Sequence, residues 1–258
     1  MGDFGIRISS GVIGLIVLIF VVYIGGIPLN IGVIGLSLIG LYELFRALKK
    51  IGFNPITSIA YFATLLIYLR IVYSALTMDF ILAFIIVFLL SLNVLRSNRN
   101  LVDISLTALG VLYIPFLLSF LVYLEGTIYI WIVFLIAFGT DTFAYLIGSK
   151  IGKNKFCPSI SPKKSVEGAI GGIFGSILVT LIYCSILEIG PWWSVLILSI
   201  LGSIASQFGD LTASKIKRYT GIKDFGKIMP GHGGMLDRFD SIIFASPVVY
   251  YYVMYFLK

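Results

Sequence analysis

Charged residues, cysteine and histidine are all scarce in this chain of 258 residues. Only 12% of the residues are charged, and the chain has two cysteines and one histidine. Two cysteines cannot build a disulfide framework, and without a Cys or His cluster a zinc site is excluded. So little charge also excludes an ordinary soluble domain. A nucleic-acid-binding role is therefore not expected, because no soluble domain is left to bind nucleic acid.

Long apolar runs fill the chain instead. Hydrophobic residues make up 59% of the sequence, and a helical membrane span needs about 20 of them in a row. The runs do not alternate apolar with polar residues, which argues against a β-barrel. No A-x-A-like cleavage site follows the first run, so we expect an uncleaved helix there. We therefore predict an all-α polytopic integral membrane protein. Its nine expected spans are residues 10–25, 28–48, 55–77, 80–95, 101–124, 127–148, 168–187, 191–209 and 239–257.

The loops between these spans differ in charge. Lysine and arginine gather in alternate loops, whereas the intervening loops carry only Asp79, Glu125 and Glu188. The positive-inside rule makes the basic loops cytoplasmic, with the N-terminus inside and the C-terminus outside. That basic face would attract anionic lipids and polyphosphates.

Two of the basic loops, 149–167 and 210–238, are longer than a connection requires, and such loops are more often functional than not. We therefore divide the chain into N-terminal transmembrane helices, 1–100, and a transmembrane catalytic region, 101–258, that carries both loops.

Four carboxylates are expected near the cytoplasmic ends of three spans. Asp141 lies inside the sixth span, where a carboxylate is costly and marks a functional site by default. Asp210 ends the eighth span. Asp237 and Asp240 open the ninth, three residues apart and so on one helix face, with Arg238 about 100° away. Close carboxylates repel unless a cation lies between them, and oxygen ligands alone suit Mg²⁺. The alternatives are helix packing for Asp141 and a favourable helix dipole for the Asp237 and Asp240 pair.

Candidate phosphate ligands accompany these carboxylates. In SPKKSVEGAIGG, Lys163 and Lys164 precede the seventh span, and Pro162 suits the first turn of a helix capped by Ser161. A helix start beside two lysines resembles an anion site, although lysines are also ordinary at a cytoplasmic flank. The glycines that follow have the small-xxx-small spacing of helix packing. They are Gly168, Gly171, Gly172 and Gly175.

The only histidine lies in a second glycine-rich stretch, GHGG. Gly231, Gly233 and Gly234 permit positive φ and a nest of amides that binds anions, and His232 can donate to a phosphate oxygen. The alternative for His232 is an ordinary hydrogen-bonded loop residue. Basic clusters, a glycine nest and Mg²⁺-type carboxylates at a membrane face together indicate phosphate chemistry on a lipid.

Residues 214–240, SKIKRYTGIKDFGKIMPGHGGMLDRFD, resemble the signature of the phosphatidate cytidylyltransferases, or CDP-diacylglycerol synthases. That signature is S-x-x-K-R-x4-K-D-x-G-x2-[LIF]-P-x-H-G-G-x2-D-R-x-D. One residue departs from it, since Met229 stands at the apolar position before Pro230. DTFAY and SPKKSVEGAIGG are also similar to family segments, so the resemblance runs from Thr140 to the C-terminus. The earlier spans resemble the family only in hydropathy and spacing.

The resemblance implies that CTP and phosphatidic acid give CDP-diacylglycerol and pyrophosphate. The lipid phosphate would attack the α-phosphorus of CTP without a covalent enzyme intermediate. It implies a Mg²⁺-dependent homodimer in the inner cell membrane, with the active site facing the cytoplasm. Asp210, Asp237 and Asp240 would be the metal ligands, with Asp210 and Asp237 preferred and the number of cations left open, and Asp141 and Lys223 would complete the catalytic group. The CTP- and phosphate-binding residues would be Ser161, Lys163, Lys164, Ser165, Lys217, Arg218, Lys227, Gly231, His232, Gly233, Gly234 and Arg238.

Three other functions are alternatives to this one. A CTP-dependent lipid-alcohol kinase would share a CTP site but move the γ-phosphate. A transporter is disfavoured, since transporters place polar groups near the membrane midplane and these charges lie at span ends. The CDP-alcohol phosphatidyltransferases carry a DGxxAR run, which the chain lacks.

Overall fold

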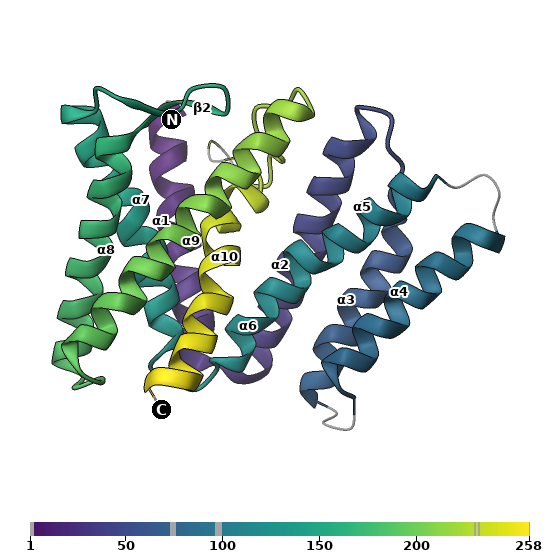
Figure 1. The fold of residues 1–258 in the computed structure, drawn as a ribbon, viewed down its shortest axis with the longest axis horizontal. Coiled ribbons are helices and arrows are strands. Elements are labelled where there is room, and N and C mark those ends of the chain that lie inside the picture. The colour runs from purple at the N-terminus through teal and green to yellow at the C-terminus, as the bar shows by residue number, and fades with distance from the viewer. Residues whose placement is uncertain (1–2, 73–75, 96–99, 230, 232, 258) are drawn as a thin grey trace. The chain divides into compact units, whose positions relative to one another are not determined.

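The computed structural model describes residues 3–72, 76–95, 100–229, 231 and 233–257 (Figure 1). Within these residues each predicted span corresponds to an apolar helical segment, and seven segments are long enough to cross a membrane. Two apolar stretches, Ser9–Ile24 and Thr57–Ile71, are shorter. The all-α membrane class is therefore confirmed. The helices are α1 (Asp3–Ile24), α2 (Gly26–Lys49), α3 (Thr57–Val72), α4 (Met78–Leu95), α5 (Leu101–Val111), α6 (Leu117–Tyr123), α7 (Ile130–Ile151), α8 (Val166–Ile186), α9 (Trp192–Tyr219) and α10 (Leu236–Tyr252).

Local sequence explains several helix boundaries. Asn100 caps α5, its side chain accepting a hydrogen bond from the amide of Val102 at 3.1 Å. The fifth predicted span is a continuous helical segment in which a π-helical turn, η1 (Leu112–Phe116), joins α5 to α6. Pro115 lies inside this turn. Proline has no amide proton for the helical ladder, so a local rearrangement is expected there. A second π-helical turn, η2 (Val253–Leu257), continues α10.

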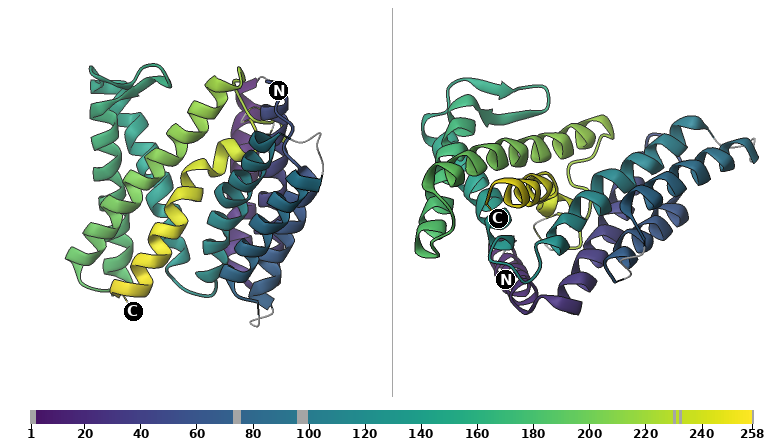
Figure 2. Two further views of the ribbon diagram at one scale, coloured as in Figure 1. Left: turned by 45° about the vertical axis from the view of Figure 1, so that its right-hand side comes forward. Right: turned by 60° about the horizontal axis from the view of Figure 1, so that its bottom comes forward.

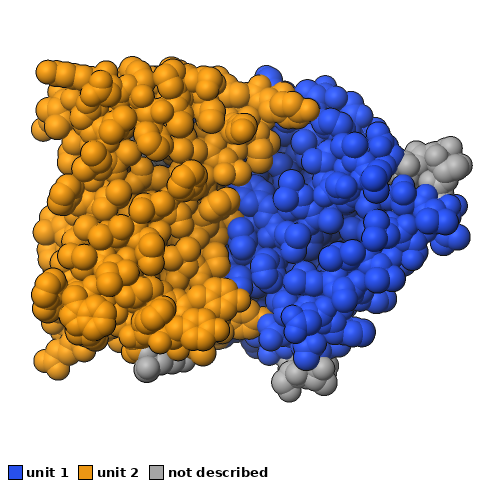
Figure 3. Space-filling view, viewed as in Figure 1, with its two compact units in different colours: residues 1–122, 220–238 blue, residues 123–219, 239–258 orange. Residues whose placement is uncertain are grey.

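The chain forms two compact units, which Figure 3 distinguishes by colour. Unit 1 comprises Met1–Val122 and Thr220–Arg238, and unit 2 comprises Tyr123–Tyr219 and Phe239–Lys258. The loop before α10 thus belongs to the unit formed by the N-terminal helices. The functional division at residue 100 stays a prediction.

Unit 1 is built round α2, which packs against α3, α5 and η1. Leu41 and Phe45 of α2 are buried in its core. The helices α5 and α2 approach closely at Gly110, where a Cβ would lie 2.6 Å from the Phe45 ring. A polar contact also crosses this core, with the hydroxyl oxygens of Ser37 and Tyr68 2.9 Å apart. Unit 1 therefore has its own apolar core and holds α2 firmly at its centre.

Unit 2 contains α7, α8 and α9, which pack against one another (Figure 2). The contact of α7 with α8 is the most extensive in the described structure. A Cβ at Gly172 would lie 2.9 Å from the carbonyl oxygen of Thr140, and one at Gly171 would collide with Ile147. The prediction that these glycines serve helix packing is confirmed. The α7–α9 contact adds a hydrogen bond of 2.8 Å from Thr140 to Ser203.

Three boundary predictions were wrong. The eighth span was expected to end at residue 209, but α9 continues to Tyr219. Residues 210–219 are polar but contain no Gly or Pro, so the helix continues beyond its apolar part. The ninth span was expected from residue 239, but α10 begins at Leu236, so Asp237 lies in its first turn.

The third correction concerns the segment before α8. Ser161 and Pro162 do not start a helix, because residues Ser161–Ser165 form strand β2, antiparallel to β1 (Lys155–Cys157). The helix begins at Val166 instead, and its cap is Ser165, whose hydroxyl accepts the amide of Gly168 at 3.1 Å. Lys163 and Lys164 are therefore on a strand that leads into the helix.

Candidate active site

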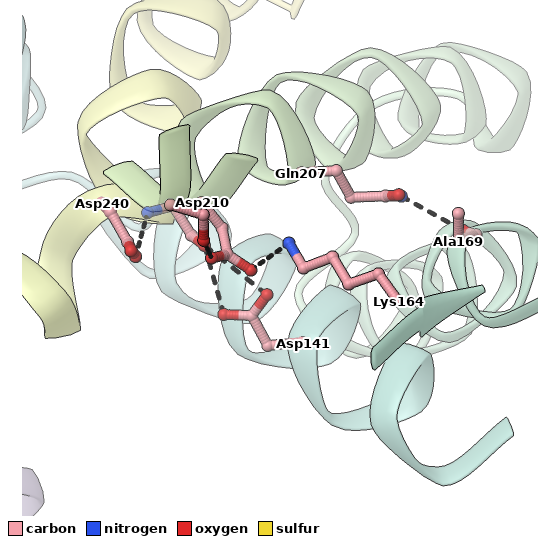
Figure 4. Close-up of polar contacts among 8 residues, drawn as sticks. Asp141, Lys164, Ala169, Gln207, Asp210 and Asp240 are labelled. Atoms are coloured by element: carbon pink, nitrogen blue, oxygen red, sulfur yellow. Dashed lines mark hydrogen bonds and ion pairs between the residues drawn. The ribbon is translucent and has the colours of Figure 1, made fainter. Parts of the chain in front are cut away.

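Three of the predicted carboxylates come together in unit 2, each from a different helix (Figure 4). Asp141 is on α7, Asp210 on α9 and Asp240 on α10. Asp240 is 6% exposed, and Asp210 and Asp141 are the acidic groups that act on it electrostatically. Like charges this close disfavour one another unless a cation balances them. The convergence that the sequence predicted for four carboxylates is thus confirmed for these three.

The close approach of two helices brings Asp210 and Asp240 together. A Cβ at Gly209 would collide with the carbonyl oxygen of Asp240 and lie 3.1 Å from its carbonyl carbon. Only glycine therefore allows α9 to run this near to α10. Ser241 adds a second link, since its hydroxyl donates to Asp141 at 3.2 Å and its amide donates to Asp240 at 2.8 Å. The carboxylates are thus fixed by backbone packing as well as by side chains.

Two lysines supply positive charge to this cluster. Lys164, on β2, forms an ion pair with Asp210. Lys217, two turns beyond Asp210 on α9, acts on Asp240 electrostatically. The hairpin that carries Lys164 is closed by Glu167, whose carboxylate accepts the amides of Lys153 and Asn154 at 3.1 and 3.2 Å. These contacts place a predicted phosphate ligand beside a predicted metal ligand.

Asp237 belongs to unit 1 and organises the loop that precedes α10. One of its oxygens, Oδ2, accepts the amides of Phe225 and Gly234 at 2.8 and 2.9 Å. Gly231 and Gly233 adopt positive φ of 77° and 92°, as the sequence predicted for a glycine-rich turn. The amide of Met229 bonds to the carbonyl of Gly233 at 3.1 Å and closes the turn. His232 lies outside the described residues.

The other predicted ligands are mostly exposed. Lys163, Lys223, Lys227, Arg218 and Arg238 all have exposed side chains. Arg218 uses its Nε to donate to the carbonyl of Ile160, at 3.2 Å, and so joins the tip of the hairpin to α9. The exposed Arg238 and the buried Asp237 agree with the predicted faces of the helix. Roles in phosphate binding for these side chains stay predictions.

Sequence reasoning missed three polar residues. Ser241 bridges Asp141 and Asp240, as described above. Glu43 is a buried carboxylate of α2, 1% exposed, and Arg46 donates to the carbonyl of Phe225. Glu43 had a usable signal, because a carboxylate within an apolar span was the reason for selecting Asp141.

The donor chemistry of the unit 2 cluster fits a hard cation. Carboxylate and hydroxyl oxygens are the groups on offer, and these are the ligands that Mg²⁺ prefers. No three Asp, Glu, His or Cys side chains of the described residues are gathered closely enough to hold one metal ion. The magnesium assignment stays a prediction.

Apolar helices long enough to span a bilayer, three of which bring carboxylates together beside Lys164 and Lys217, define a polytopic membrane protein with a charged polar site. Comparison with known proteins places it more closely. The chain belongs to the cytidylyltransferase family, whose model matches residues 5–256.

Relatives in several bacteria match nearly the whole chain. The phosphatidate cytidylyltransferase of Bacillus subtilis is 32% identical over 271 aligned residues, which cover 99% of this chain and 100% of the relative. The phosphatidate cytidylyltransferase of Staphylococcus saprophyticus is 37% identical, covering 95% of this chain and 96% of its own. That of Staphylococcus aureus strain COL is 36% identical with the same coverage. The expected family membership is confirmed.

Proposed function

We propose that this chain is a phosphatidate cytidylyltransferase, which transfers the CMP moiety of CTP to phosphatidic acid in phospholipid biosynthesis. The products are CDP-diacylglycerol and pyrophosphate. The observation that carries the proposal is the identity of 32–37%, over nearly the full length, to bacterial proteins of that name. The charged cluster of unit 2 is consistent with it, since both substrates are phosphates and one is a membrane lipid.

The reaction requires charge control rather than a nucleophile from the protein. An oxygen of the lipid phosphate forms a bond to the α-phosphorus of CTP. The bond from that phosphorus to the oxygen bridging the β-phosphorus breaks, and pyrophosphate leaves with the bonding electrons. Two anions must meet, so positive groups have to offset their repulsion. We expect Lys164, which pairs with Asp210, and Lys217, which acts on Asp240 electrostatically, to do so.

Asp210 and Asp240 are the residues of unit 2 that would hold Mg²⁺. Bound there, the ion would polarise a phosphoryl group and neutralise charge on the leaving pyrophosphate. Asp141 faces the same cluster and is held by the hydroxyl of Ser241, at 3.2 Å. Its position on α7, inside an apolar segment, suits a residue that orients a lipid headgroup. Asp237 remains a candidate ligand on sequence grounds.

We further propose that the protein lies in the inner membrane of a bacterial cell with the active site facing the cytoplasm, and that it is a homodimer. The orientation rests on the distribution of basic residues between alternate loops. A cytoplasmic site is also the one that has access to CTP. The dimer rests on the family resemblance.

The deciding assay uses purified protein with Mg²⁺, phosphatidic acid and CTP labelled at the α-phosphate. We expect the label to enter the lipid phase. A parallel reaction with γ-labelled CTP should put no label into lipid and should release labelled pyrophosphate. A lipid-alcohol kinase, given a lipid alcohol in place of phosphatidic acid, would give the opposite pattern, with γ-label in lipid and α-label in soluble CDP.

A matched pair of variants assigns the activity to the cluster. Asp240→Asn keeps the shape of the side chain but removes its charge, and we expect a rate loss of about 100-fold or more. Asp79→Asn makes the same change at an exposed position on α4 and should leave the rate unchanged. Equal rates for both variants would contradict the role of Asp240. Wild-type protein that leaves the α-label in water would contradict the proposed function itself.

A further inference from the structure

A buried carboxylate in unit 1 has no part in the reaction as described so far. Glu43 lies on α2, and its side chain accepts two backbone amides, those of Met235 at 3.1 Å and Leu236 at 2.8 Å. A carboxylate shielded from water is costly unless its oxygens are hydrogen-bonded. The first amides of a helix also lack partners within the helix. Glu43 therefore accepts hydrogen bonds from amides at the start of α10 that have no partner within the helix. Its negative charge also suits the positive end of the helix dipole.

Two glycines in the loop before α10 make room for this carboxylate. A Cβ at Gly234 would lie 2.5 and 2.6 Å from the two Glu43 oxygens, and a Cβ at Gly226 would collide with Oε1. Neither glycine has a positive φ, in contrast to Gly231 and Gly233. Turn geometry therefore does not require glycine at 226 or 234. Glycine is required there by the close approach of the Glu43 side chain and by that of the two glycines to each other, since a Cβ at Gly234 would also lie 2.5 Å from the amide nitrogen of Gly226.

Arg46 holds the other end of the same loop. It lies one turn beyond Glu43 on α2 and donates through Nη2 to the carbonyl of Phe225. The amide of Phe225 in turn donates to Asp237 at 2.8 Å. The helix α2 therefore contacts the loop on both sides of the glycine-rich turn, through Arg46 at Phe225 and through Glu43 at Met235 and Leu236. The amides that hold Asp237 belong to Phe225, which Arg46 itself contacts, and to Gly234, which precedes Met235.

We propose that Glu43 and Arg46 are positioning residues that fix Phe225, Met235 and Leu236 on α2 and thereby set the direction of the Asp237 carboxylate. The proposal rests on the proposed function, because Asp237 matters to activity only if that function is right. Neither residue needs to touch substrate. Their role is to hold a backbone that would otherwise be set only by a glycine-rich sequence.

Hydrogen exchange on the full-length protein in detergent micelles tests this directly. In Glu43→Gln one oxygen becomes an NH₂ group, which cannot accept the amide of Met235 or Leu236. We expect exchange of the peptide covering residues 233–237 to become about 10-fold faster or more, because a charged buried acceptor is lost. Exchange in α2 and α3 should stay as in the wild type. Arg46→Gln, at an exposed side chain, should speed exchange at residues 224–226 in the same way.

Kinetics and a matched control complete the experiment. With CTP, phosphatidic acid and Mg²⁺, both variants should lose about 10-fold or more in kcat/KM for CTP, and should need more Mg²⁺ for half-maximal rate. Ser37→Ala is the control. It removes a buried polar group from the same helix, two turns earlier, whose partners are Val33 and Tyr68 and not the loop. Its exchange at residues 224–237 and its rate should match the wild type.

Two results would overturn the proposal. One is wild-type exchange and kinetics in both Glu43→Gln and Arg46→Gln. The other is a loss of protection throughout α2 and α3 in Glu43→Gln while Arg46→Gln behaves as wild type, which would make Glu43 a core residue only. If the wild-type enzyme forms no CDP-diacylglycerol, the proposed function fails. The exchange data still decide whether α2 holds the loop.

Discussion

Substitution of Gly209 by alanine should abolish most of the activity while leaving the protein folded. The added Cβ would collide with the carbonyl oxygen of Asp240 and approach its carbonyl carbon to 3.1 Å and the Cβ of Phe244 to 3.2 Å. The colliding atoms are mostly backbone, so no side chain can rotate away. Ordinary van der Waals contact requires α9 and α10 to part by roughly 1 Å at this level. The helices carry Asp210 and Asp240, so the two carboxylates part as well.

The size of the effect follows from that displacement. Misplacing catalytic groups by 1 Å costs on the order of 100-fold in rate, whereas overpacking costs only about 1–3 kcal/mol of stability. We therefore expect kcat to fall about 100-fold, measured as α-labelled CDP-diacylglycerol, in protein that still purifies as a single species. Gly35→Ala is the control, because a Cβ at that helical position meets nothing within 4 Å. Activity of Gly209→Ala within about twofold of Gly35→Ala would refute the argument that glycine sets this geometry.

Three other predictions address charge, packing and topology. Lys164→Met should raise the KM for CTP about 10-fold or more, because the ion pair with Asp210 shows that this lysine reaches the carboxylate cluster. Lys155→Met, at the exposed start of the hairpin, should leave the KM for CTP unchanged. Gly175→Ala forces a Cβ into the ring of Phe143 and should lower the thermal stability of purified protein by about 1–3 kcal/mol. Cys157 should react with a membrane-impermeant maleimide only after cells are opened, and reaction in intact cells would reverse the proposed orientation.

The helical spans were predictable because lipid selects residues by their apolar character, position by position. The same signal failed where a helix leaves the bilayer. Residues 210–219 are polar, so hydropathy ends the span at 209, yet α9 continues to Tyr219. The distinction matters for Asp210, which was expected at a helix end and lies within the helix. Likewise the hairpin of residues 155–165 could not be predicted from so short a segment, whose form depends on Glu167 and Arg218 as partners.

Some residues of the candidate site could likewise be predicted from the sequence and others could not. Asp141 was predictable because a carboxylate in an apolar span is rare enough to be informative alone, and Asp210 and Asp240 because they stand at the ends of two spans on the same side of the membrane. Glu43 satisfied the same criterion as Asp141 and was passed over beside the basic flank of its span. Its partners, Met235 and Leu236, are 192 and 193 residues away in the sequence, so nothing local indicates what it binds. The partners of Glu43 can be identified only from the fold, in which α2 lies against the loop that precedes α10.

The glycine-rich loop shows how a contact can change the meaning of a motif. The sequence suggested that GHGG forms a nest for a phosphate, with its amides turned toward substrate. In the structure the amide of Gly234 donates to Asp237, and the next two amides donate to Glu43. These donors are therefore engaged by carboxylates of the protein itself. The amide of Gly234 is therefore not available to a phosphate, whereas the phosphate-binding prediction for Lys164 gains support from its ion pair with Asp210 in the carboxylate cluster.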